Sequence, residues 1–292
     1  MNERSLARIY TLMAAFFWGT SFVVIRWGLL YLPAAEFLFL RFLIATVIML
    51  VIIIVAGRFW EFYKLLCNGS IVFAALLNAL GYVLQFLGQQ FTIATNASLL
   101  INTSAVFVAI FAHFILDEKL TKLRGMAILI SLLGTVLLIT NLSFSSLMTQ
   151  YFLGDMLCLL AGLIWSLYIV YTKKITNLHA DDLSLLTVWF FYTTIFSLPL
   201  IIFQGFKSPS INGWLAILYT SFLCTIIPFL LWFNGLKILE AVTSSIYFLM
   251  EVLISAILEL MIFGLSLSLV KIIGALMMCL GMILTDISYK ST

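Results

Sequence analysis

Ten continuous apolar stretches constrain this chain more than any other feature of its sequence. An α-helix needs about twenty apolar residues to cross the hydrocarbon core of a membrane, and each stretch is close to that length. Because the stretches do not alternate with polar residues, they predict helices rather than the strands of a barrel. The predicted fold class is an all-α membrane protein with ten transmembrane helices, at about 7–29, 34–56, 69–90, 94–115, 124–141, 152–172, 183–204, 213–235, 242–263 and 269–288.

The composition excludes several classes of protein. The chain is 64% hydrophobic and only 9% charged, whereas soluble domains are roughly half apolar and a quarter charged. The net charge of +3 is too small to indicate a nucleic-acid partner. The sequence has no phosphate-binding loop and no metal-ligand spacing. We therefore predict no cofactor, no metal and no use of ATP, and a lipid bilayer as the surroundings.

The basic residues predict the orientation in the membrane. With the N-terminus inside, most of them fall on the inner face, and cytoplasmic loops are typically rich in Lys and Arg. We expect a multi-pass protein with both termini in the cytoplasm, and the short connections favour a prokaryotic cytoplasmic membrane. The inner residues are Arg4, Arg8, Arg58, Lys64, Lys119, Lys122, Arg124, Lys173, Lys174, Lys237 and Lys290, and the outer ones are Arg26, Lys207 and Lys271.

The chain repeats itself at a separation close to half its length. Trp18 recurs as Trp165, and 165 − 18 = 147; pairs of glycine, alanine and serine keep the same separation. This predicts two five-helix repeats, 1–146 and 147–292. Because five is an odd number, the second repeat enters the membrane from the opposite side, an inverted arrangement that many secondary transporters use. A duplicated scaffold without a transport role is the alternative.

Motifs spread over the whole chain form a combination that is more specific than any one of them. They are Trp18-Gly19-Thr20-Ser21-Phe22, Pro33, Arg41-Phe42, Asp117-Glu118-Lys119-Leu120-Thr121 and Leu249-Met250-Glu251-Val252. Together they resemble the drug/metabolite transporter superfamily, and most closely its EamA-type ten-helix branch, with Val252 in place of the family's proline. The resemblance implies a secondary carrier, most often an exporter of amino acids or other small metabolites, with a central cavity between the two halves.

A polar stripe runs along the third apolar stretch. Asn78, Tyr82, Gln85 and Gln89 follow one another in steps of 4, 3 and 4 residues, which places them on one face of a helix. Polar side chains that face lipid are costly, so we expect this face to point into a cavity or towards other helices. Contact with a substrate and hydrogen bonding between helices are both open.

The positions 147 residues later predict a cavity with one polar and one aromatic wall. They are Thr225, Phe229, Trp232 and Leu236. Such a lining suits a small amphipathic solute with an apolar side and a hydrogen-bonding end. Aromatic residues make up 15% of the chain, so each ring could instead pack or lie at the membrane interface. The predicted substrate-binding residues are Trp18, Ser21, Asn78, Tyr82, Gln85, Gln89, Asn102, Trp165, Tyr168, Phe229, Trp232, Tyr247 and Glu251.

Charged residues inside the predicted helices are candidates for coupling or gating. Glu251 lies near the middle of the ninth helix, where an ionised acid costs about 3 kcal/mol. We expect it to line a wet cavity, to bond a donor such as Tyr247, or to bind a proton, and a structural role stays open. Either Glu36 or Glu259 could neutralise Arg41, as a gating pair or as a structural salt bridge. Glu36 is five residues away on the same helix, at an awkward angle, so we favour a partner across helices.

These observations predict a carrier that works by alternating access. The expected substrate is a small amphipathic metabolite, most readily an amino acid or a related zwitterionic or cationic solute. A nucleoside-bearing sulfonium compound is an alternative substrate, and a proton is a candidate coupling partner. An intramembrane enzyme or lipid-handling protein is an alternative from another class, but the sequence shows no catalytic partner for Glu251. We therefore do not expect an enzyme.

Overall fold

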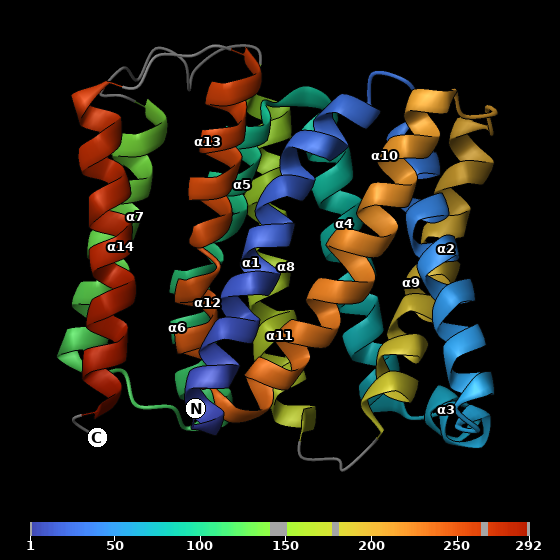
Figure 1. Cartoon of the computed structure of the whole chain (residues 1–292), viewed down its shortest axis with the longest axis horizontal. Helices are drawn as coiled ribbons and strands as arrows, with labels where there is room; N and C mark the ends of the chain where they lie inside the picture. The colour runs from blue at the N-terminus through green and yellow to red at the C-terminus, as the bar shows by residue number, and fades with distance from the viewer. Residues whose placement is uncertain (1, 141–150, 177–180, 264–267, 291–292) are drawn as a thin grey trace.

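The computed structural model describes residues 2–140, 151–176, 181–263 and 268–290, and the ordered elements in these ranges are helices (Figure 1). The predicted repeat boundary at 146/147 lies outside these ranges. The helices are α1 (Glu3–Gly28), α2 (Ala34–Val55), α3 (Phe59–Leu66), α4 (Gly69–Phe91), α5 (Ala94–Asn102), α6 (Ser104–Leu116), α7 (Lys122–Thr140), α8 (Phe152–Ile175), α9 (Asp182–Gln204), α10 (Ile211–Ser221), the π-helical turn η3 (Phe222–Ile226), α11 (Ile227–Ile238), α12 (Ala241–Tyr247), α13 (Met250–Phe263) and α14 (Leu269–Lys290).

The chain is a multi-pass integral membrane protein. In the described ranges, eight helices are long and apolar enough to cross a membrane, and a shorter apolar helix covers Ile272–Leu284. The helices stand side by side, and α1 begins at the same end of the bundle at which α14 ends (Figure 1). Large apolar side chains cover the outside, such as Ile202, which is 75% exposed, and Leu276, which is 64% exposed. Hydrocarbon can solvate such a surface, whereas water cannot do so without a large free-energy cost.

Glycines allow helices from the two halves of the chain to cross closely. α1 packs against α11 and α13, and α8 packs against α4, α5 and α6. A Cβ atom added to Gly19 of α1 would lie 2.7 Å from the Cβ of Ile254, and one added to Gly162 of α8 would lie 2.8 Å from the carbonyl oxygen of Ile101. Small residues permit such crossings in membranes. The crossings hold α1 and α8 against the helices that are interrupted in mid-span.

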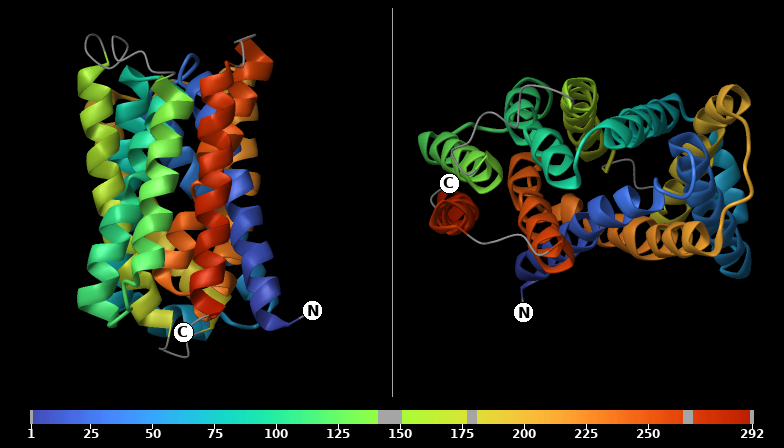
Figure 2. Two further views of the ribbon diagram at one scale, coloured as in Figure 1. Left: turned by 90° about the vertical axis from the view of Figure 1, so that its left-hand side faces the viewer. Right: turned by 90° about the horizontal axis from the view of Figure 1, so that it is seen from above.

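α7 and α14 form a separate pair at one side of the bundle (Figure 2). Their contact is also close, because a Cβ atom added to Gly134 would lie 2.6 Å from the carbonyl oxygen of Gly274. The other helices pack around a centre that this pair does not reach, and that centre holds the cavity described below.

Polar contacts tie the bundle together at the end where α1 begins, the lower end in Figure 1. The Glu118 carboxylate accepts hydrogen bonds from the backbone N–H groups of Ala241 (2.8 Å) and Val242 (3.2 Å), which open α12. Burial raises the pKa of this carboxyl, and the two backbone donors oppose that effect. The Lys173 ammonium donates to the carbonyl of Leu236 (2.7 Å) near the end of α11. Both ends of the α11–α12 connection thus meet an opposite charge.

An ion pair completes this arrangement within the connection itself. Arg124 of α7, whose side chain is almost fully buried, pairs with Glu240 and also donates to the carbonyl of Lys119 (2.9 Å). We call Glu118, Arg124, Lys173 and Glu240 the basal cluster. It joins the first half of the chain to the α11–α12 connection.

Candidate functional site

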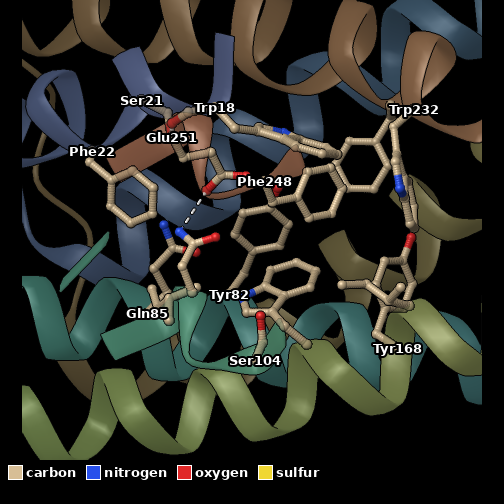
Figure 3. Close-up of a pocket in the computed structure, with 15 residues that line it drawn as sticks. Trp18, Ser21, Phe22, Tyr82, Gln85, Ser104, Tyr168, Trp232, Phe248 and Glu251 are labelled. Atoms are coloured by element: carbon tan, nitrogen blue, oxygen red, sulfur yellow. Dashed lines mark hydrogen bonds between the residues drawn. The ribbon is translucent and has the colours of Figure 1, made fainter. Parts of the chain in front are cut away.

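A cavity of about 60 Å³ lies inside the bundle, bounded by side chains from both halves of the chain (Figure 3). A water molecule needs about 10–15 Å³ by a comparable measure, so the cavity has room for several. It is lined by Trp18, Ser21 and Phe22 of α1, Tyr82 and Gln85 of α4, Ile101 and Asn102 of α5, Ser104 of α6, Trp165, Tyr168 and Ile169 of α8, Phe229 and Trp232 of α11, and Phe248 and Glu251 around the start of α13.

Aromatic rings form one side of the cavity. The Trp18 ring lies edge to face with Phe248, Phe229 and Trp232, at centroid distances of 5.2, 5.4 and 5.9 Å. The Trp232 indole N–H donates to the Ser244 hydroxyl at 3.0 Å, which fixes the orientation of that ring. Rings held in this way present electron-rich faces, and such faces attract cations as well as apolar groups.

Glu251 supplies the formal charge among the lining residues, and polar side chains surround it. Its Oε2 accepts a hydrogen bond of 3.4 Å from the Asn102 side-chain amide, which also donates to the carbonyl of Ser98 at 2.9 Å. Figure 3 shows Glu251 and Gln85 on the same side of the cavity, away from Trp232. The carboxylate keeps unused acceptor capacity. It can therefore bind a cationic group or a proton that enters the cavity.

Two interrupted helices place these groups at mid-span. α5 ends at Asn102 and α6 begins at Ser104, while α12 and α13 are separated by Phe248 and Leu249. Around the second interruption the backbone N–H of Glu251 bonds the carbonyl of Phe248 at 2.8 Å, three residues back rather than four. The interruption forms although Val252 stands where the resembling family has proline. Discontinuous helices of this kind often build solute sites in transporters.

Only the middle of the predicted polar stripe reaches the cavity. Tyr82 and Gln85 line it, as predicted. Asn78 donates instead to the Thr193 hydroxyl of α9 at 2.8 Å, and Gln89 donates to the carbonyl of Phe22 at 3.1 Å. These two side chains therefore bond neighbouring helices.

Arg41 donates its hydrogen bonds to neutral oxygen atoms of the η3 segment. Its side chain is fully buried, its Nε donates to the Thr225 hydroxyl at 2.7 Å, and its Nη2 donates to the carbonyl of Cys224 at 2.6 Å. Glu36, the less favoured of the two candidate partners, instead accepts a hydrogen bond from the backbone N–H of Lys207 in the α9–α10 connection. The side chain of Glu259 lies outside the described part of the structure.

The remaining predicted residues divide in the same way. Trp18, Ser21, Asn102, Trp165, Tyr168, Phe229, Trp232 and Glu251 line the cavity. Tyr247, expected beside Glu251, is buried but does not line it. Phe248, at the break between α12 and α13, lines the cavity. The residues that the sequence analysis missed are Phe22, Ile101, Ser104, Ile169 and Phe248.

Comparison with known proteins assigns the family. The EamA-like transporter family matches residues 5–140 and again residues 152–286. An uncharacterized transporter of Archaeoglobus fulgidus is 32% identical over 248 residues, covering 82% of this chain and 83% of its own. The uncharacterized transporter YyaM of Bacillus subtilis is 24% identical over 287 residues, covering 94% and 92%.

A solved structure shares the fold. This crystal structure of another protein superposes with a TM-score of 0.80 at 17% identity, and the match covers 99% of both chains. The two family matches begin 152 − 5 = 147 residues apart, the separation at which Trp18 recurs as Trp165. Together they cover nearly the whole chain. This chain therefore belongs to the EamA-like transporter family.

Proposed function

We propose that this protein is a secondary carrier of a small amphipathic solute whose cationic group binds Glu251. The observation that carries the proposal is one acidic side chain in a cavity whose other described lining residues are aromatic, aliphatic or neutral polar. A carboxylate attracts a cation, and the aromatic faces hold both the cation and an apolar part of the solute. Amino acids and related zwitterionic or cationic metabolites fit this description.

A nucleoside-bearing sulfonium compound is a second candidate substrate, and two observations favour it. The cavity offers the flat rings of Trp18, Trp232 and Tyr168, on which a base could stack. Among the described lining residues no Lys or Arg is available for a carboxylate group. A solute with a net positive charge would therefore bind with fewer unpaired groups than a zwitterion.

Alternating access requires two similar ways to close the cavity, and an inverted repeat of ten spans supplies them. The packing supports this arrangement: α1 crosses α11 and α13 of the second half, and α8 crosses α4 and α5 of the first half. The second helices of the two halves, α2 and α9, pack on each other, as do the last ones, α7 and α14. Exchanging the halves thus preserves the pattern of contacts.

The basal cluster supports a state that is closed towards the cytoplasm. It lies at the end where the chain starts, together with the ion pairs Arg58–Asp181 and Lys237–Asp182. The excess of basic residues at this end agrees with a cytoplasmic location for both termini. In our proposal, release of the solute to the cytoplasm requires the basal cluster to open.

Counterflow in proteoliposomes tests the proposal. Purified protein is reconstituted and screened against cationic, zwitterionic and anionic solutes, and we expect saturable exchange for a cationic or zwitterionic solute. Linear flux without exchange would instead indicate a channel, and a chemically altered solute would indicate an enzyme.

In Glu251→Gln we expect at least a ~30-fold loss of apparent affinity, since losing one charged hydrogen bond costs about 2 kcal/mol. Glu61→Gln, at an exposed acid of α3, is the matched control and should leave exchange unchanged.

The pH dependence of exchange tests whether Glu251 also handles a proton. A proton and a cationic solute would compete for the same carboxylate, so apparent affinity for the solute should fall as the pH is lowered. Glu251→Gln should remove this dependence. Exchange in the variant that still responds to pH in the same way would assign proton coupling to another residue.

A further inference from the structure

A proline leaves one backbone carbonyl without its helical partner at the edge of the cavity. In a regular α-helix, the carbonyl of Cys224 would accept the N–H of residue 228, but that residue is Pro228 and has no N–H. The chain accommodates this in the π-helical turn η3, in which the N–H of Ile227 bonds the carbonyl of Phe222. A buried carbonyl that stays unpaired is costly, so the oxygen of Cys224 requires a donor from elsewhere.

Two other helices supply donors to this single oxygen. Arg41 of α2 donates its Nη2 hydrogen at 2.6 Å, and Trp18 of α1 donates its indole N–H at 3.2 Å. A carbonyl oxygen has two lone pairs and can accept both bonds. Trp18 is at the same time the centre of the aromatic side of the cavity. Arg41 is therefore linked to a cavity ring through one shared acceptor.

Arg41 also supports a second cavity residue. Its guanidinium carbon lies 4.9 Å from the centroid of the Tyr82 ring, within the range of a cation–π contact. Arg41 itself does not line the cavity, and no carboxylate in the described residues pairs with it. A buried guanidinium is expensive inside a membrane even where neutral oxygen atoms accept its hydrogen bonds. An apolar side chain would fill the same space at a lower free-energy cost. We therefore infer that the charge and the hydrogen-bond donors of Arg41 do more than fill space.

We propose that Arg41 and the carbonyl freed by Pro228 form a positioning device that sets the selectivity of the cavity from outside it. The device fixes the planes of Trp18 and Tyr82, and these planes decide whether an aromatic group fits beside a cation bound at Glu251. The proposal rests on the function proposed above. It assigns to Arg41 a role that neither a gate nor a salt bridge describes.

Two substitutions test the device without touching the cavity. Arg41→Met removes the donors but keeps an apolar chain, whereas Pro228→Ala restores an N–H that can occupy the Cys224 carbonyl. The matched control is Pro199→Ala, at a proline inside α9. The protein is labelled with 5-fluorotryptophan, and the Trp18 signal is assigned with Trp18→Phe. We expect both test variants to shift the ¹⁹F resonance of Trp18, the control to leave it in place, and Arg41→Lys to restore it in part.

Affinities for tetramethylammonium and benzyltrimethylammonium, measured by binding to the purified protein, provide the selectivity readout. We expect the preference for the benzyl compound to fall about fivefold in Arg41→Met and in Pro228→Ala, and to stay unchanged in Pro199→Ala. The double variant should lose no more than either single variant, because both break the same contact.

Each result decides one part of the proposal. An unmoved Trp18 signal in a folded Arg41→Met variant would overturn the positioning role. A shifted signal with an unchanged ratio of affinities would overturn the role in selectivity. If neither cation binds to the native protein, the selectivity role fails together with the proposed function, whereas the ¹⁹F signal still decides the positioning role because it needs no solute.

Discussion

α4 and the span formed by α10, η3 and α11 hold matching positions 147 residues apart, yet they are built differently. α4 is one continuous helix, whereas the other span is interrupted before Pro228. The pairs Tyr82/Phe229 and Gln85/Trp232 all line the cavity. In the first pair, α4 provides the hydroxyl of Tyr82 and α11 provides the apolar ring of Phe229. In the second pair, α4 provides the amide of Gln85 and α11 provides the large indole of Trp232. The comparison shows how a duplicated wall can become a pair of unlike walls without a change of fold.

The ends of the two spans teach a second lesson. Asn78 and Gln89 have the same polar character as Gln85, yet both bond neighbouring helices. Their counterparts Thr225 and Leu236 also stay away from the cavity. Position along the span, rather than polarity, decides which of these residues line the cavity. The following predictions test this division, starting with the largest expected effect.

Trp232→Ala should have the largest effect. It removes a ring that is 1% exposed and leaves the Ser244 hydroxyl without its indole donor. Loss of a buried aromatic side chain typically costs 3–5 kcal/mol, so we expect thermal unfolding in detergent to begin ~10 °C earlier. We also expect the affinity for aromatic solutes to fall. A variant with native stability would show that the aromatic wall is loosely packed, contrary to the ring contacts seen here.

Gln85→Leu should affect solute binding more than stability. The side chain lines the cavity close to Glu251, and its hydrogen bond to Gln89 is long, at 3.4 Å. Losing one neutral hydrogen bond to a solute costs about 1 kcal/mol, which corresponds to roughly fivefold in affinity. Counterflow at graded solute concentrations measures this change. Unaltered kinetics would remove Gln85 from the site and leave α4 as a structural wall.

Asn78→Leu should show the opposite behaviour on the same helix face. It breaks the bond to Thr193, and interhelical hydrogen bonds in membranes contribute about 0.6 kcal/mol on average. We expect a stability loss on the order of 1 kcal/mol and no change in solute affinity. A double-mutant cycle with Thr193→Val isolates the pair. An affinity change as large as that of Gln85→Leu would contradict the division between the middle and the ends of the stripe.

Glu118→Gln should give the smallest effect, far from both walls. Burial raises the pKa of Glu118 above its ordinary value of 4.5, so the folded state holds a proton that the unfolded state has already released. The contribution of Glu118 to the free energy of unfolding therefore falls as the pH rises above 4.5. As the pH is raised from 4.5, the native protein should lose more thermal stability than the variant, by on the order of 1 °C. Equal slopes would indicate that Glu118 titrates normally.

The sequence could predict the helices because continuous apolar runs have one main explanation in a protein. It also predicted most of the cavity, since the spacing of Tyr82 and Gln85 fixes a helix face and the repeat supplies Phe229 and Trp232. It could not predict where helices are interrupted. Phe248 lies at the break between α12 and α13 and lines the cavity, whereas the predicted Tyr247 does not, and Val252 gives no sign of this break.

Arg41 shows a second kind of limit. An arginine predicted to be buried suggests a carboxylate partner, because a sequence lists the acidic residues. It does not list the backbone carbonyls that lack a helical hydrogen bond. Pro228 marks the freed carbonyl of Cys224, but 187 residues separate it from Arg41 (228 − 41) and only the fold brings them together. Backbone acceptors created by prolines are a signal that sequence analysis can use when a buried arginine has no evident acid.

The basal cluster holds a connection of only two residues, Leu239 and Glu240, between α11 and α12. α11 carries Trp232, and the segment that follows α12 carries Phe248 and Glu251. Because this connection is so short, a rearrangement that separates it from Glu118 or Lys173 would also move α11 and α12. Opening the cytoplasmic end of the protein would then also change the shape of the cavity. A bound solute would be released by the same movement that opens its way out.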